Sequence, residues 1–248
     1  MMNKMMKNNL LLPVMFLSVM CSCILAQAGF ADKENLVNEE FSENTGNYDG
    51  KVEIKDGKAV FSAGRAGKYL GTSILFKKQL PIPNGKDKFL HLKIKVDGFS
   101  EKTGKEDFPC SLSIFFIPEP LPSLIDPYLN PDALWLFVQY SGKTTSISLY
   151  SKANQEKFGT LLYRTTADPG IFPLEMDLYF NTEAYRVSFD RPLKTDKGNV
   201  SGYHGLLPAI WKDNIKFGMR IVNNSDDGAV SQVILDKISI NAAEKETK

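Results

Sequence analysis

The stretch FPCSLSIFFIPEPLPSLIDPYLNPDALWLFVQY, residues 108–140, places two strongly apolar runs on either side of a proline-rich segment. The second run, Ala133–Tyr140, is apolar at both alternating phases, which is typical of a strand covered on both faces. The five prolines between the runs lack amide donors and fix φ, so they exclude a helix interior or a central strand there. We therefore predict two core strands of a β-sandwich, joined by an ordered loop on its rim.

Short alternating segments fill the rest of the chain. In residues 89–96, for example, apolar side chains occupy one phase and polar side chains the other. The same pattern, bounded by turn signals, predicts strands at 35–41, 52–54, 59–62, 69–76, 145–150, 160–165, 174–180, 185–190, 217–221 and 231–240. We expect a polar loop at 191–205 and one helical turn at 206–211. About twelve short strands without a long helix predict an all-β, antiparallel two-sheet sandwich of the jelly-roll type.

The last predicted strand, 231–240, changes phase partway along its length. Val233 and Leu235 share one phase, whereas Ile238 and Ile240 share the other. One extra residue restores a buried face, so the pattern predicts a β-bulge at Asp236-Lys237.

The first 28 residues have the features of a signal peptide. Lys4 and Lys7 form a basic start, residues 10–25 are apolar, and Ala26-Gln27-Ala28 fits the small-x-small cleavage rule. We expect cleavage after Ala28 and export to the periplasm, the cell surface or the medium. Two alternatives stay open, namely an uncleaved anchor helix and a lipoprotein attached through Cys23.

The mature chain is expected to form one domain. We predict a polar lead at 29–34, a single β-sandwich at 35–241 and a frayed tail at 242–248. No later run approaches the ~20 apolar residues of a membrane span, so no transmembrane segment is expected in the mature chain.

Cys110 would be the only cysteine of the mature chain, which excludes an internal disulfide. Without Lys4 and Lys7 the chain has 28 basic and 29 acidic residues, which gives no reason to expect a nucleic-acid partner.

The order and length of these segments resemble the concanavalin A-like group of jelly rolls, which includes laminin-G-type domains, legume-type lectins and glucanases. The matching features are Gly71-Thr-Ser-Ile-Leu-Phe76, the strand–turn–strand at 174–189 and the closing Val233-Ile-Leu-Asp-Lys-Ile-Ser-Ile240. A second likeness, to carbohydrate-binding modules of the galactose-binding-like type, rests on Asn35-Leu-Val-Asn-Glu-Glu-Phe41 and Leu235-Asp236. Both resemblances imply a polysaccharide or glycan ligand.

Glu175-Met-Asp177 is the sharpest catalytic candidate. Glucanases of this group carry Glu-x-Asp-x-Glu on one strand, with the first Glu as nucleophile and the last as general acid. Here Glu175 and Asp177 match the first two acidic positions, but Tyr179 occupies the last. Because retaining hydrolysis normally needs two carboxyl groups in nucleophile and acid roles, the missing proton donor argues against catalysis.

Polar residues that alternate outward from the core could share one sheet face. They are His91, Lys93, Lys95, Ser146, Ser148, Tyr150, Glu175, Asp177, Tyr179, Arg186, Ser188, Asp190 and Arg220. If that sheet is concave, the resemblance implies that sugars bind there; the alternative is an ordinary solvated face. The candidate ligand-binding residues are Tyr128, Tyr179, Arg186, Tyr203, His204 and Trp211, of which Trp211 could equally be a packing residue.

No cofactor is expected, with calcium as the one metal considered. Glu40 and Asp236 could bring the chain ends together around the ion, and Asn223-Asn-Ser-Asp-Asp-Gly228 offers further hard oxygen ligands.

Three functions fit the sequence. They are a non-catalytic carbohydrate-binding protein, a glycoside hydrolase of the same fold using Glu175 and Asp177, and a structural or adhesive protein of the cell envelope.

Overall fold

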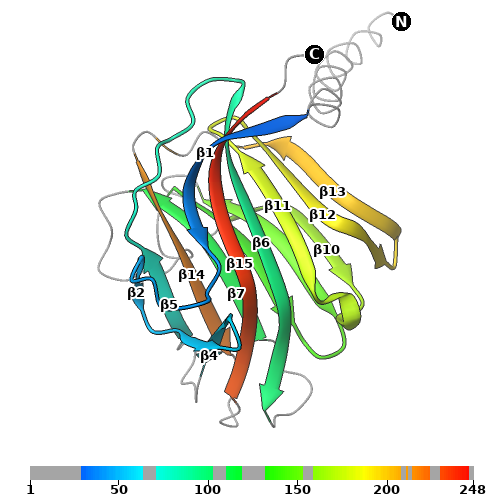
Figure 1. Cartoon of the computed structure of the whole chain (residues 1–248). Helices are drawn as coiled ribbons and strands as arrows, with labels where there is room; N and C mark the ends of the chain where they lie inside the picture. The colour runs from blue at the N-terminus through cyan, green and yellow to red at the C-terminus, as the bar shows by residue number, and fades with distance from the viewer. Residues whose placement is uncertain are drawn as a thin grey trace, which may run out of the picture.

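The computed structural model describes residues 29–63, 71–102, 110–118, 132–152, 159–207, 211, 214–223 and 230–245. These residues form antiparallel strands stacked in two layers (Figure 1). None of the described segments forms a helix with the length and hydrophobicity that a membrane span requires. The all-β antiparallel sandwich predicted from the alternating pattern is confirmed.

One layer, called sheet I, contains both apolar runs of residues 108–140. Its strand order is β2 (Tyr48–Gly50), β5 (Gly71–Phe76), β14 (Ile215–Asn223), β7 (Cys110–Pro118), β8 (Ala133–Tyr140), β9 (Thr145–Lys152) and β10 (Thr160–Ala167). The other layer, called sheet II, has the order β13 (Gly198–Leu206), β12 (Ala184–Thr195), β11 (Leu174–Phe180), β6 (Lys88–Lys102), β15 (Val230–Lys245), β4 (Lys58–Ala63) and β3 (Glu53–Lys55). Strand β1 (Phe30–Glu39) pairs with β15, and the pair Ala167–Thr195 joins the two sheets at one edge.

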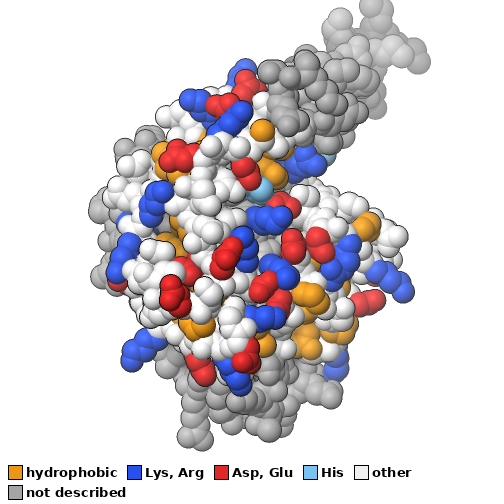
Figure 2. Space-filling model, in the orientation of Figure 1, with side chains coloured by type: hydrophobic (Ala, Val, Ile, Leu, Met, Phe, Trp, Pro, Cys, Tyr) orange, Lys and Arg blue, Asp and Glu red, His pale blue; other side chains and the backbone are white. Residues whose placement is uncertain are grey.

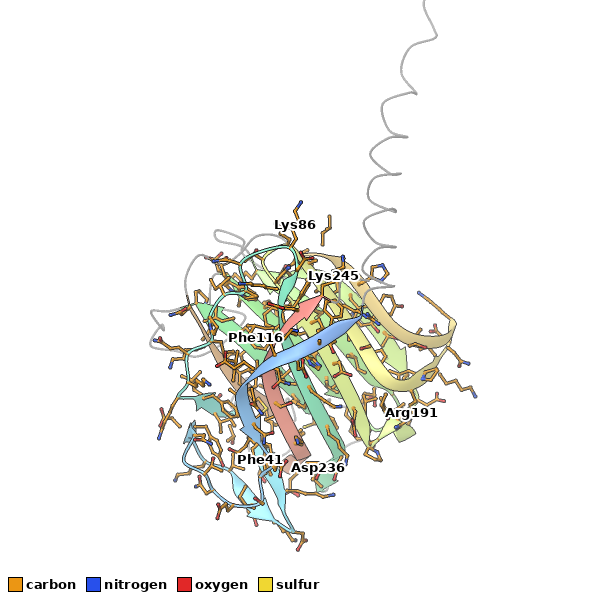
Figure 3. All side chains as sticks on the ribbon, turned by 45° about the horizontal axis from the view of Figure 1, so that its top comes forward. Phe41, Lys86, Phe116, Arg191, Asp236 and Lys245 are labelled. Carbon is orange, nitrogen blue, oxygen red and sulfur yellow. The ribbon has the colours of Figure 1, made fainter. Side chains whose placement is uncertain are left out.

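The core fills the space between the sheets with the inward phase of each strand. Phe116 of β7 lies between the layers, with its ring 4.6 Å from Phe180 of β11 and 5.3 Å from Phe217 of β14 (Figure 3). All three side chains are fully buried. Cys110 is also fully buried, as its in-phase position with Leu112 and Ile114 predicts.

A two-residue hairpin and a β-bulge set the register of strands in sheet II. Asp56 and Gly57 both have positive φ in the turn between β3 and β4, which is the conformation that a two-residue hairpin needs. The pairing of β15 with β6 shifts between Leu235 and Lys237, so the bulge predicted from the phase slip is confirmed.

Several strands are longer than predicted. β6 continues to Lys102, beyond the strand predicted at 89–96, and the expected polar loop at 191–205 is the end of β12 followed by β13. β1 begins at Phe30 and β15 runs to Lys245, so both extend past the domain limits expected at residues 35 and 241. In each case backbone pairing with a neighbouring strand overrides a polar or glycine-containing sequence.

Candidate functional site

The outward polar residues lie on two surfaces. Nine are on the outer face of sheet II, namely His91, Lys93, Lys95, Glu175, Asp177, Tyr179, Arg186, Ser188 and Asp190. Ser146, Ser148, Tyr150 and Arg220 are on the outer face of sheet I. The expectation of one shared face is therefore wrong, because a period of two separates inside from outside without assigning a strand to a layer.

Three candidate ligand-binding residues form a row across sheet II. The strand register places His91 opposite Tyr179, Tyr179 opposite Arg186, and Arg186 opposite His204. The rings of His91 and Tyr179 stack with centroids 4.0 Å apart. The structure thus brings Tyr179, Arg186 and His204 together, as a shared binding face would require.

Strand β1 covers part of this row. The ring of Phe30 stacks on Tyr179 at 4.4 Å between centroids, and the guanidinium carbon of Arg186 lies 5.8 Å from the Phe30 ring. Phe30 also meets the edge of Phe89, which makes a small apolar cluster on the outer side of sheet II. Figure 3 shows β1 crossing this side of the sheet. The face is therefore partly closed where the candidate residues gather.

His91 of β6 links β1 to sheet II through hydrogen bonds to Asp32 of β1 and Asp177 of β11. Its Nδ1 lies 2.7 Å from Asp32 Oδ1, and its Nε2 lies 2.7 Å from Asp177 Oδ1. Burial alone would lower the pKa of His91, but hydrogen bonds and charge interactions with Asp177 and Asp32 outweigh it, so the pKa is raised. Burial, with the same two carboxylates nearby, also raises the pKa of Tyr179 to about 12.

We expect His91→Gln to lower the free energy of unfolding by about 1–3 kcal/mol at pH 5.5, because the hydrogen bonds from the buried imidazole to two charged groups are lost. The folded-state pKa of His91 lies above that of the unfolded chain, roughly 6.5. The stabilisation from the imidazolium is therefore complete below roughly pH 6.5 and is lost as the pH rises through the folded-state pKa. Urea unfolding of both proteins at pH 5.5 and 9 should show the stability difference shrinking at pH 9.

His204→Gln provides the matched control, because His204 contacts no carboxylate in the part of the chain that the structure describes. A stability difference for His91→Gln that stays constant or grows with pH would contradict the assigned role of His91.

Ion pairs occupy much of the remaining outer face of sheet II, where acidic and basic side chains intermingle (Figure 2). The pairs are Lys93–Glu175 at 3.7 Å, Lys95–Asp236 at 2.5 Å, Arg191–Asp190 at 2.7 Å and Lys58–Asp97. The two carboxylates considered for catalysis are both engaged, Glu175 by Lys93 and Asp177 by His91. Tyr179, which occupies the last position of the glucanase-like Glu-x-Asp-x-Glu pattern, is stacked between His91 and Phe30.

The remaining aromatic candidates lie apart. Trp211 is buried, its ring meets Phe180 at 5.4 Å, and its Nε1 donates to the Asp132 carbonyl at 2.6 Å. It is a packing residue, which corrects its inclusion among the ligand-binding residues. Tyr203 is 38% exposed and lies against Tyr163 of β10 at the edge of the sandwich. Tyr128 falls outside the described residues.

The two carboxylates considered as calcium ligands, Glu40 and Asp236, each pair with a lysine. Lys237 contacts Glu40 at 2.9 Å, and Lys95 contacts Asp236 at 2.5 Å. Throughout the described ranges, no group of three or more His, Cys, Asp or Glu side chains could hold a metal ion. Residues 224–229, which include most of the Asx-rich candidate loop, are outside those ranges. These contacts give the calcium hypothesis no support.

The outer face of sheet I combines aromatic rings with neutral hydrogen-bonding groups. Its buried end is a cluster of Phe115, Ile117, Ala133 and Trp135, against which Phe137 and Tyr150 pack half-buried. Trp135 on this outer face and Leu134 and Leu136 on the inner face are all fully buried, so the prediction that β8 is covered on both faces is confirmed. The next row across the sheet contains Ser73, Arg220, Ser113, Phe137, Ser148 and Arg164, and the row beyond it contains Ser111, Gln139, Ser146 and Thr166.

Arg164 connects the aromatic and polar parts of this face. It is exposed, and its Nε donates to Ser148 Oγ at 3.1 Å while its Nη2 donates to the Tyr150 hydroxyl at 2.6 Å. Sequence reasoning did not assign Arg164, Phe137 or Gln139 to a binding site. The available signal was the outward phase of residues 160–165, but only the strand register shows that Arg164 meets Ser148.

The structure resembles solved carbohydrate-recognition domains across most of its length. The carbohydrate recognition domain of Emp47p superposes with a TM-score of 0.59 at 11% identity, covering 86% of this chain and 96% of that one. The winged bean acidic lectin, solved with methyl-α-D-galactose, gives 0.55 at 10% identity, covering 89% and 100%. The κ-carrageenase of Pseudoalteromonas carrageenovora, solved with an oligosaccharide, gives 0.51 at 6%, covering 89% and 97%. No protein-family model and no curated protein sequence matches the chain.

Proposed function

Because the chain has the concanavalin A-like jelly-roll fold of the lectins, we propose that it is an exported, non-catalytic glycan-binding protein. Its binding surface is the outer face of sheet I around Phe137, Tyr150 and Arg164. The observation that carries this assignment is the hydrogen-bonded group of Arg164, Ser148 and Tyr150 beside half-buried aromatic rings.

This chemistry suits a sugar. A pyranose ring presents C–H groups on its faces and hydroxyl groups around its rim, so it binds to aromatic rings flanked by neutral donors and acceptors. Tyr150 and Phe137 supply rings, and Gln139, Ser146 and Thr166 supply hydrogen-bonding groups in the adjacent row. These groups stand on paired strands, which hold them in fixed relative positions.

The outer face of sheet II fits a glycan less well. Its carboxylates and cations largely satisfy one another, and a ligand would have to break those ion pairs to use them. Phe30 also covers Tyr179 and contacts Arg186 there. Sheet I is therefore the preferred binding layer.

A glycan array followed by titration tests the proposal. Tyr150→Ala should weaken binding of any captured glycan about tenfold or more, which corresponds to about 1.4 kcal/mol. Lys93→Ala, on the opposite face, should leave binding unchanged. Capture of no glycan, or equal weakening by both variants, would contradict the proposal.

The non-catalytic part of the proposal has its own test. We expect the captured glycan to stay intact during prolonged incubation, because Tyr179 stands where the general acid of the glucanases lies. Glycan cleavage by the wild type that disappears in Glu175→Gln would show an enzyme instead.

Export is supported by the basic start, apolar stretch and Ala26-Gln27-Ala28 site of the leader. The mass of the protein recovered from cells that express the full chain should correspond to a start at Gly29. Recovery of the full-length chain, or of a lipid-modified chain starting at Cys23, would favour one of the two anchored alternatives.

A further inference from the structure

The charged residues in six strands of sheet I are all basic. Six adjacent strands, β5, β14, β7, β8, β9 and β10, contain no Asp or Glu. Their charged residues are Lys152, Arg164, Lys216 and Arg220, all at outward positions in the register. Sheet II differs sharply, since β6, β11, β12 and β15 each contain at least one acidic residue. The described strands that form the proposed binding face therefore contribute only basic charged residues, although the whole chain has a net charge of only +1.

The Arg164 side chain is held in place by hydroxyl groups, which do not cancel its positive charge. Its two hydrogen bonds go to hydroxyl groups, those of Ser148 and Tyr150, and within the described ranges no carboxylate pairs with it. A guanidinium has five N–H donors, so these contacts leave donors available to a ligand. Arg191 on sheet II shows the contrast, because it is paired with Asp190 at 2.7 Å. The hydroxyl contacts fix the plane of the Arg164 guanidinium and keep its charge for a ligand.

Resting on the proposed glycan-binding function, we infer that the ligand is an acidic glycan, with carboxylate or sulfate groups that meet Arg164. A planar guanidinium matches the paired oxygens of either group, and such charge-assisted hydrogen bonds are stronger than neutral ones. Aromatic rings beside Arg164 provide packing for the sugar ring that carries the charge. A neutral glycan would leave this guanidinium without a counter-charge in the complex.

Two matched pairs of polymers test the inference. Polygalacturonate is compared with its methyl ester, and dextran sulfate with dextran, so that each pair differs in charge while the backbone is kept. Titration of the full mature chain should show at least one acidic member binding about tenfold or more tightly than its neutral partner. Binding should weaken between 50 and 300 mM NaCl, because the contact is between charges. Which pair responds distinguishes carboxylate from sulfate recognition.

Arg164→Gln locates the contact. It should reduce the affinity for the acidic polymer about tenfold and bring it close to that for the neutral partner. Lys93→Gln removes one positive charge from the opposite face and should leave affinity unchanged. Thermal unfolding of both variants confirms that each one is folded before titration.

The contradicting outcomes separate this inference from the proposed function. Binding of neutral glycans at least as tightly as acidic ones, here or on the array, would overturn the acidic ligand and leave glycan binding in place. Binding of no glycan of any kind would overturn both. Tighter binding of a single-stranded DNA oligonucleotide than of every acidic glycan, or equal loss in Arg164→Gln and Lys93→Gln, would also overturn the inference.

Discussion

Phe116→Ala is expected to lower the free energy of unfolding by about 3–5 kcal/mol, the range measured for truncating a fully buried phenylalanine. Phe116 is 0% exposed and joins the two layers, because its ring meets Phe180 of sheet II as well as Phe217 of its own sheet. The loss combines the transfer free energy of the ring with the cavity that remains between the sheets. Urea unfolding followed by tryptophan fluorescence measures it.

Leu161→Ala is the control on the same sheet, since Leu161 is 45% exposed. This substitution should lower the free energy of unfolding by less than about 1 kcal/mol. A cost for Phe116→Ala as small as that of Leu161→Ala would mean that the two layers do not pack on each other as described.

Trp211→Ala has the second largest expected effect, again about 3–5 kcal/mol of stability. The indole is buried against Phe180 and donates a hydrogen bond to the Asp132 carbonyl. Trp211→Phe should keep most of the packing and lose about 1 kcal/mol with the hydrogen bond. Glycan affinity per folded molecule should be unchanged in both variants, because Trp211 lies in the core. A loss of affinity without a loss of stability would restore Trp211 as a stacking platform.

The sequence predicted the strands in which alternation is strict. Leu174–Phe180 is an example, with buried and half-buried residues in regular alternation, as the residue types indicate. The phase slip before Ile238 likewise predicted the bulge, since a buried face on both sides of it requires one extra residue. In these segments local pattern and tertiary packing demand the same arrangement.

The sequence could not predict which layer each strand joins. Tyr150 and Tyr179 both alternate outward, but they belong to opposite faces because β9 pairs with β8 and β11 pairs with β6. β13 was missed because Gly198, Gly202 and Gly205 give it the composition of a loop. A Cβ atom at Gly202 would clash with the Val187 carbonyl of the neighbouring strand, and a Cβ atom at Gly205 would clash with the Tyr185 ring.

The candidate site was only partly predicted for the same reason. The row of Tyr179, Arg186 and His204 is present, but Phe30 covers part of it, although the composition of residues 29–34 predicts only a polar lead. The group around Arg164 depends on the register between β9 and β10, which includes a shift between Leu161 and Tyr163. A contact set by such a shift is not visible in alternation alone.

The most direct measurement of the central claim is a titration of the isotope-labelled mature chain with a captured glycan, followed by backbone amide chemical shifts. The account predicts that the largest shifts fall at Phe137–Gln139, Ser146–Tyr150 and Arg164, on the outer face of sheet I. Shifts confined to β6, β11 and β12 would place the ligand on sheet II and contradict the account.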